Sequence, residues 1–461
     1  MMPALIGVVC EWLLAFVCPG SDAAPAPEAR IFPPPASTPL RSICSGRLQF
    51  ITQRHPCING LHTKRRRHLT AAAATPSDHN GPLSLSPSRR DHIGESLLLP
   101  SAALVAACTA AVPSAQAVGR PPPADAAGLG PERIPQGDYV TLGGLSVAPM
   151  GIGTWAWGNK FLWDYDPARD AELQAAFNYC VEHGLNWFDS ADSYGTGELA
   201  GRSEILLGKF IQSYKGGPRD DIRVATKFAP YPWRVGRGSI VQACRETLER
   251  LQRPCLDVAQ LHWSPPLGWQ EDAYIDGLAD CVDRGMARAI GVSNYGPVKL
   301  QGVVRQLKAR GLTLASNQVQ LSLLSRVPLE SGLLDTCREN GVVLIGYSPL
   351  CLGLLSGKYD ADNMPKGARG VLFRQLLPKV GPLIQTLREV ANERSKTVGQ
   401  VALNWCLAKG AVPLVGVKTA KQAEENLGAL GWRLSEAEVR ALDDVSSAVK
   451  AKTLQNIFQT A

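Results

Sequence analysis

Four polar side chains of the sequence could together protonate the oxygen of a carbonyl group. Tyr194 is the proton donor of the set, although a phenol with an ordinary pKa near ~10 is a weak acid at neutral pH. An ammonium group from Lys227 beside the phenol favours the phenolate and is expected to lower that pKa. A buried lysine needs a carboxylate partner, which Asp189 can supply. His262 could hydrogen-bond and orient the carbonyl oxygen, so the set fits reduction of a carbonyl by hydride.

These side chains lie near the ends of short apolar runs that alternate with amphipathic segments from residue 139 onward. Apolar residues at three- and four-residue spacing predict helices over 172–182, 239–251 and 299–309. Eight strands that alternate with helices indicate an α/β fold, a (β/α)8 TIM barrel, with a doubly wound open sheet as the alternative. The expected strands are residues 150–155, 186–191, 223–228, 256–263, 287–294, 315–321, 342–348 and 411–417.

Two glycine motifs bear on the choice between barrel and open sheet. Gly151-Ile152-Gly153 is followed by Thr-Trp rather than by a helix start, so we interpret it as a false match to a dinucleotide-binding loop. Residues 139–147, with Gly143-Gly144 at their centre, predict an N-terminal hairpin that caps the bottom of the barrel.

Polar residues stand at the carboxyl ends of the expected strands, where barrels carry their catalytic groups. Burying a polar side chain costs desolvation free energy unless the side chain is paired. Six polar side chains around one rim of the barrel therefore indicate a functional site. Five are near strand ends, Asp189, Lys227, His262, Asn294 and Tyr347, and Gln318 lies within the sixth strand.

Several longer motifs resemble those of the aldo-keto reductases, from about residue 142 to 442. Residues 187–195, WFDSADSYG, resemble the family segment that carries an Asp and a Tyr five residues apart. Residues 224–227, VATK, and 256–263, LDVAQLHW, resemble its lysine and histidine strands. The further matches are GVSNY at 291–295, SNQV at 316–319, YSPL at 347–350, GVK at 416–418 and ENLGAL at 425–430. Within the family the chain is similar to the plant and algal chloroplast branch.

The resemblance implies an NADPH/NADP+ site on the same rim. Many members have an arginine at the position of Gln422, so recognition of the 2′-phosphate is expected to depend more on Lys418. The carboxamide would be bound by Ser293, Asn294 and Gln318, the ring by Tyr347, the pyrophosphate by Ser348, Leu350, Gly357 and Lys358, and the adenosine end by Gly416, Lys418, Gln422, Glu425 and Asn426. Residues 353–380, an insertion after the seventh strand, are expected to be a cofactor lid or a disordered loop.

Residues 1–137 differ in composition from the barrel, residues 138–461. Between Pro27 and Ser77 one acidic residue stands against eight basic ones, which predicts a largely disordered chloroplast transit peptide. Within residues 89–117, twin arginines precede an apolar stretch and an Ala-x-Ala site, the pattern of an export signal. We therefore expect the protein in the chloroplast, in the stroma or at the thylakoid, with the lumen as a further possibility.

Charge and cysteine usage limit the other partners. Hydrophobic residues are 45% and charged residues 19% of the chain, as in soluble globular proteins. Residues 138–461 have a net charge of only +3, which gives no reason to expect nucleic acid. The 12 cysteines form no C-x-x-C pair, so neither a metal site nor a disulfide framework is expected. No transmembrane segment is expected in the barrel, and we expect a monomer.

The preferred function is an NADP-dependent oxidoreductase that reduces aldehydes or ketones to alcohols with Tyr194 as proton donor. The alternative is a nucleotide-binding regulatory subunit, like the channel-associated relatives of these reductases, which the complete set of four residues disfavours. Pyridoxal, quinones, lipid-derived aldehydes and sugar-derived dicarbonyls all remain open as the small-molecule substrate. Trp155, Trp157, Trp263 and Trp269 suggest a pocket for flat or apolar carbonyl compounds.

Overall fold

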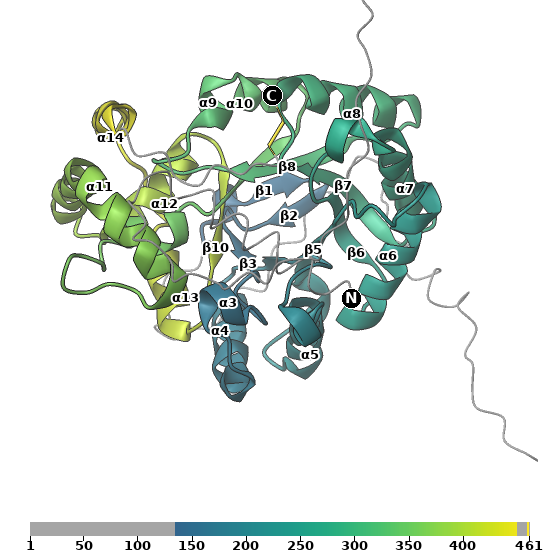
Figure 1. Ribbon diagram of the computed structural model, residues 1–461, viewed down its shortest axis with the longest axis horizontal. Coiled ribbons are helices and arrows are strands. Elements are labelled where there is room, and N and C mark those ends of the chain that lie inside the picture. Colours follow the sequence, from purple (N-terminus) through teal and green to yellow (C-terminus); the bar gives the residue numbers. More distant parts are fainter. Residues whose placement is uncertain (1–133, 450–458, 461) are drawn as a thin grey trace, which may run out of the picture. The chain divides into compact units, whose positions relative to one another are not determined.

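The computed structural model describes residues 134–449 and 459–460, in which eight parallel strands close into a barrel (Figure 1). Consecutive strands pair side by side, and β10 closes the ring by pairing with both β9 and β3. The predicted barrel is therefore confirmed. The strands are β3 (Gly151–Gly153), β4 (Trp187–Asp189), β5 (Arg223–Phe228), β6 (Leu256–Leu261), β7 (Ala287–Ser293), β8 (Leu314–Gln320), β9 (Val343–Tyr347) and β10 (Val412–Gly416).

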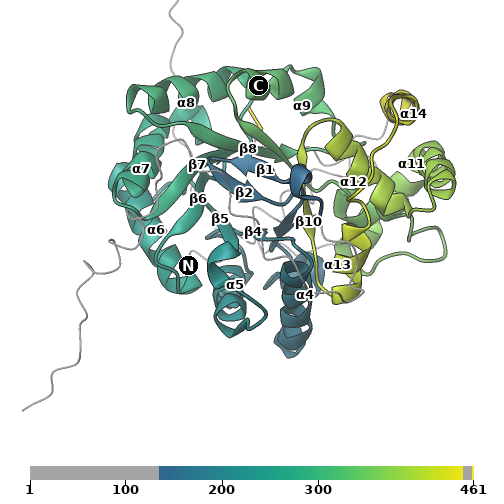
Figure 2. The same ribbon diagram turned by 180° about the vertical axis from the view of Figure 1, so that it is seen from behind.

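Helices surround the strands in both views (Figures 1 and 2). The longer ones are α4 (Asp170–Glu182), α5 (Arg202–Ser213), α6 (Arg237–Leu251), α7 (Glu271–Asp283), α8 (Pro297–Ala309), α11 (Gly367–Glu393), α12 (Val398–Ala408), α13 (Ala420–Leu427) and α14 (Glu436–Ala448). The shorter ones are α3 (Lys160–Trp163), α9 (Val327–Glu330) and α10 (Leu333–Glu339). The 3-10 helices are η1 (Gln136–Asp138), η2 (Pro167–Arg169), η3 (Gly197–Leu199), η4 (Arg219–Asp221), η5 (Pro266–Gly268) and η6 (Cys351–Ser356).

Barrel strands are buried on both faces, which explains why their sequences are nearly continuous apolar runs. Every residue of β6 and β8 is buried. The predicted strand, residues 150–155, is longer than β3. The prediction followed the run of apolar residues, which continues beyond Gly153, but Gly153 is the last residue that pairs with a neighbouring strand. Gly151 packs against Trp187 of β4, where a Cβ would lie 2.3 Å from the indole ring. Both glycines thus lie within strand β3, where the absence of a side chain at Gly151 allows close packing against β4.

A two-stranded hairpin precedes the barrel, as predicted. Strands β1 (Val140–Leu142) and β2 (Leu145–Val147) pair antiparallel across Gly143-Gly144, both with positive φ. A Cβ at Gly143 would lie 2.5 Å from the Cβ of Ala289 in β7, so the turn fits closely against the inside of the strands. In both views the hairpin lies over the centre of the ring (Figures 1 and 2). It therefore closes one end of the barrel.

The segment 353–380 is not a disordered loop. The 27-residue helix α11 begins at Gly367 and continues through Pro378 and Pro382 to Glu393. Its apolar residues recur every three or four positions and are buried, which stabilises the helix more than the two prolines weaken it. The buried residues include Phe373, Leu376, Val380, Leu383, Ile384 and Leu387.

The predicted targeting leader lies outside the described residues, apart from residues 134–137. The twin-arginine segment 89–117 lies wholly outside them. In the described part of the chain, no helix has the length and apolarity needed to cross a membrane.

Candidate active site

A buried ion pair forms the floor of the site. Asp189 is the last residue of β4 and Lys227 lies on the neighbouring β5, and their side chains form a salt bridge. Lys227 Nζ also donates to the backbone oxygen of Ser190 at 2.7 Å. Burial lowers the pKa of Lys227, but the negative charge of Asp189 and the hydroxyl of Tyr194 more than offset it, so the pKa is raised. Lys227 therefore remains an ammonium ion.

Tyr194 is held above this pair by the turn that follows β4. Its backbone nitrogen donates to Ala191 O at 3.1 Å, and Lys227 Nζ lies 5.0 Å from the centre of the phenol ring. Lys227 lowers the pKa of Tyr194, as the sequence predicts, but this effect does not dominate. Burial raises the pKa more than Lys227 lowers it, and the charge of Asp189 adds to the rise. The phenol therefore keeps its proton at neutral pH.

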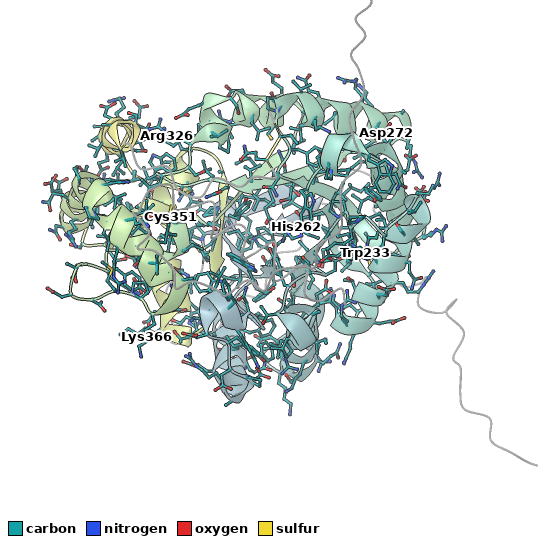
Figure 3. All side chains as sticks on the ribbon, viewed as in Figure 1. Trp233, His262, Asp272, Arg326, Cys351 and Lys366 are labelled. Atoms are coloured by element: carbon teal, nitrogen blue, oxygen red, sulfur yellow. The ribbon has the colours of Figure 1, made fainter. Side chains whose placement is uncertain are left out.

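His262 completes the set at the end of β6. Its ring lies 5.8 Å from that of Tyr194 in an edge-on arrangement, near the centre of the strand ring (Figure 3). Burial lowers its pKa well below 6.5, and the positive charge of Lys227 lowers it further. The imidazole is therefore neutral at pH 7, with one N–H donor and one bare nitrogen. The structure thus brings all four residues of the set together.

Gln260 belongs to the same site and was missed in the sequence. Its amide nitrogen donates to Asp189 Oδ2 at 2.8 Å, and that of Gln318 donates to the same oxygen at 2.9 Å. The two amides and Lys227 together satisfy the buried carboxylate. The sequence contains a signal for Gln260. It lies two positions before His262 on an apolar strand, so both side chains face the same side of the sheet.

The residues expected to hold the carboxamide and the nicotinamide ring form one hydrogen-bonded group. Asn294 follows β7 with a positive φ of 67°, and its amide nitrogen donates to His262 O at 3.0 Å. Ser293 Oγ donates to the backbone oxygen of Gln318 at 2.8 Å. Tyr347, the last residue of β9, donates its hydroxyl to Asn294 Oδ1 at 3.0 Å. Their roles toward a cofactor stay predictions.

The loop after β9 carries the residues expected at the pyrophosphate. Ser348 has a positive φ of 52°, Leu350 precedes η6, and Gly357 follows it with a φ of 74°. Lys358 forms an ion pair with Glu425 of α13 at 2.5 Å. Lys358 is expected at the pyrophosphate and Glu425 at the adenosine. Their ion pair therefore joins the loop after β9 to α13, the helix after β10.

The residues expected at the adenosine end follow β10. Gly416 ends that strand, and the side-chain oxygen of Gln422 accepts from the backbone nitrogen of Lys418 at 2.8 Å. Asn426 is buried in α13. Lys418 Nζ donates to Trp163 O at 3.3 Å and lies 5.8 Å from the centre of the Trp163 ring. Gln422 thus orients the start of α13 and adds no charge.

Two further residues extend this end of the site. Arg369 of α11 lies 4.9 Å from the centre of the Trp163 ring, the same indole that Lys418 contacts. Within the described residues, Arg369 Nε and Trp163 Nε1 are buried without a hydrogen-bond partner. Burial lowers the pKa of Lys418, and the positive charges of Arg369 and Arg169 lower it further. Cations this close repel one another, so the cluster fits an anionic group such as a phosphate.

A second ion pair, which was not expected from the sequence, lies beside the set of four residues. Asp192 pairs with Arg234 at 2.6 Å, and both side chains are largely buried. Burial raises the pKa of Asp192 to about 6, against the opposing effect of Arg234. Among the described residues, no three His, Cys, Asp or Glu side chains gather as a metal site, and the cysteines there are buried and unbridged.

Comparisons with known proteins agree with this geometry. Residues 149–447 match the model of the aldo/keto reductase family. The chain is 50% identical over 327 residues to a chloroplastic pyridoxal reductase of Arabidopsis thaliana, covering 70% of this chain and 89% of that one. It is 30% identical over 320 residues to L-glyceraldehyde 3-phosphate reductase of Escherichia coli, covering 65% and 89%.

A solved structure gives the same picture. A thermostable aldo-keto reductase in complex with the inhibitor epalrestat is 28% identical with a TM-score of 0.54, and the alignment covers 67% of this chain and 99% of that one. The family model spans more than half of the chain, and a relative at 50% identity aligns over nearly its whole length. This chain therefore belongs to the aldo/keto reductase family.

Proposed function

We propose that the protein reduces aldehydes or ketones to alcohols with NADPH, and that Tyr194 is the proton donor. The buried Asp189–Lys227 ion pair beside the phenol carries this proposal. A buried ammonium has no structural use that an apolar residue could not serve, and the pair costs desolvation free energy. Beside a tyrosine, however, it stabilises the phenolate that remains when the proton has left.

Each residue of the set then has a distinct task. Tyr194 holds its proton at neutral pH and donates it from the hydroxyl to the carbonyl oxygen. Lys227 balances the negative charge left on the phenol, and Asp189 keeps Lys227 charged. His262, which is neutral, donates a hydrogen bond to the same carbonyl oxygen and orients the substrate.

The charged cluster around Trp163 supports NADPH rather than NADH as the cofactor. NADPH supplies the hydride for the carbonyl carbon when it is bound. Lys418 and Arg369 would hold its 2′-phosphate, and the unpartnered Arg369 Nε is one donor available for it. Ser293, Asn294, Gln318 and Tyr347 would hold the nicotinamide end, and Ser348, Leu350, Gly357 and Lys358 the pyrophosphate. Gly416, Gln422, Glu425 and Asn426 would hold the adenosine.

Pyridoxal is the substrate we favour, and the chloroplast the compartment. The name of the Arabidopsis relative supports both, and the acid-poor leader composition supports the compartment. Pyridoxal carries its aldehyde on a flat aromatic ring. Tyr231 and Trp233 stack with ring centres 4.5 Å apart on the loop after β5, a surface suited to such a ring.

The proposal is tested with the purified full chain, NADPH and a panel of carbonyl compounds. Loss of NADPH absorbance with pyridoxal, together with pyridoxine identified by chromatography, is the expected result. Glyceraldehyde and an aromatic aldehyde without a ring nitrogen serve as comparison substrates. Tight NADPH binding without turnover of any compound would refute the enzyme proposal, and turnover of every compound except pyridoxal would refute the substrate alone.

A further inference from the structure

The turn between β4 and α5 carries a hydroxyl that faces the catalytic imidazole. Asp192 and Ser193 are the two central residues of the turn from Ala191 to Tyr194, which the hydrogen bond from Tyr194 N to Ala191 O closes. Ser193 Oγ lies 3.4 Å from Nδ1 of His262. The residue next to the proton donor thus contacts the ring that orients the substrate.

A second tyrosine, Tyr231, lies near Ser193 on the loop after β5. The Ser193 hydroxyl lowers the pKa of Tyr231, although burial and the charge of Asp192 raise it overall. Of Tyr231, Ser193 and His262, only His262 belongs to the set of four expected from the sequence.

The loop that carries Tyr231 is fixed to the same turn. Arg234 pairs with Asp192 Oδ2 at 2.6 Å and donates to Ala229 O at 2.6 Å. Ala229 N donates to Asp192 Oδ1 at 3.2 Å. Arg234 and Ala229 thus each contact one carboxylate oxygen of Asp192, so the loop after β5 holds the turn that carries Ser193.

The direction of these hydrogen bonds determines what His262 can offer the substrate. A neutral imidazole has one N–H and one acceptor nitrogen. If Ser193 donates to Nδ1, the proton lies on Nε2, which can donate to a carbonyl oxygen. The reverse direction would turn a bare nitrogen toward the lone pairs of that oxygen, which is repulsive.

We propose that Ser193 is a positioning residue whose hydroxyl, on the turn that the Asp192–Arg234 ion pair holds, donates to Nδ1 of His262 and so keeps the proton on Nε2 and the ring in its orientation. The inference rests on the proposed reductase function, since it explains how His262 donates to a carbonyl. It adds a residue that determines the tautomer of the imidazole.

The first test measures the imidazole directly, without turnover. In the full chain labelled with 15N-histidine, the His262 nitrogens are assigned by comparison with His262→Gln. We expect Nε2 to resonate as a protonated nitrogen and Nδ1 as an acceptor shifted by a hydrogen bond. Ser193→Ala should move Nδ1 toward the position of a free acceptor, and Ser193→Thr, which keeps the hydroxyl, should not.

The second test measures catalysis with the same variants. Ser193→Ala should lower kcat for pyridoxal on the order of tenfold with little change in the NADPH Kd, because the lost orientation matters most in the transition state. Ser193→Thr should restore most of kcat. Ser213→Ala, an exposed serine of α5, is the matched control and should change neither readout.

The outcomes separate this inference from the proposed function. A proton on Nδ1 in the wild type, or an Nδ1 resonance unmoved by Ser193→Ala, would overturn the positioning role even in an active enzyme. Wild type that turned over no carbonyl compound would overturn the function, whatever the tautomer. Circular dichroism of each variant shows that the fold is kept.

Discussion

At the scale of single residues, the site depends on how burial and charge compete at Tyr194. Residue types and spacing were enough to predict the four residues, because an Asp and a Tyr five apart and a Lys and a His on later strands converge on one rim. The direction of the Tyr194 pKa could not be predicted, because it depends on how deeply the fold buries the phenol. Gln260 was missed because an amide within an apolar strand does not by itself indicate a carboxylate partner.

Tyr194→Phe should lower turnover of an aldehyde by on the order of 10²-fold or more, because the phenyl ring keeps the packing and removes the proton donor. NADPH binding should barely change. Steady-state rates and a fluorescence titration measure the two effects. Tyr179→Phe, on the outer helix α4, is the control. If Tyr194→Phe kept most of its turnover, the phenol would not be the donor.

Asp192 should make folding stability depend on pH in a distinctive direction. Its pKa of about 6 in the folded protein exceeds the ordinary value of 3.8, so the folded state binds this proton more tightly than the unfolded state. Its contribution to stability is therefore largest at low pH and is lost as the pH rises through about 6. Relative to Asp192→Asn, wild type should gain on the order of 1–2 kcal/mol of unfolding free energy between about pH 7 and pH 4.5.

Urea unfolding of both proteins at the two pH values measures this difference. Other titrating groups are common to both and cancel. Parallel pH profiles would show that the carboxylate has the same pKa in the folded and unfolded chain.

At the scale of elements, periodicity predicted all eight strands and three of the helices, since buried strands and amphipathic helices leave different patterns. It did not predict α11, which contains Pro378 and Pro382, residues that normally interrupt a helix. Its apolar face is buried, and the helix packs mainly against α12 and α14, which follow it in the chain. The missing helix also hid a residue of the site, because α11 carries Arg369 and places it beside the Trp163 ring.

Lys418→Ala and Arg369→Ala should each weaken NADPH binding by about tenfold or more and leave NADH nearly unchanged, since only NADPH carries the 2′-phosphate. Wild type should prefer NADPH by about ten- to a hundredfold, or about 1–3 kcal/mol. Fluorescence quenching gives the two dissociation constants. Arg374→Ala, an exposed arginine of the same helix, controls for lost surface charge. Equal wild-type affinities would show that the cluster around Trp163 does not bind the phosphate.

At the scale of the whole molecule, the chain combines a barrel with a leader of different composition. The buried core of the described residues extends from Ile134 to Leu442, and all eight barrel strands find both of their partners within it. A unit with its own core and a closed sheet has no edge strand that needs another segment. Residues 138–461, which lack only Ile134 of this core, should therefore fold unaided, with one cooperative thermal transition close to that of the full chain.

Removal of the leader in the cell follows from the same division. Its basic, acid-poor stretch has the composition that organelle import uses, and the Ala-x-Ala site at 115–117 has the small residues that processing enzymes accept. The buried core of the barrel begins after both targeting signals. Cleavage upstream of this core would therefore remove none of its packed side chains. We expect protein from the native organelle to begin between Ala71 and Arg120. N-terminal sequencing of the purified protein measures this directly, and an intact Met1 on protein found outside any organelle would contradict the chloroplast assignment.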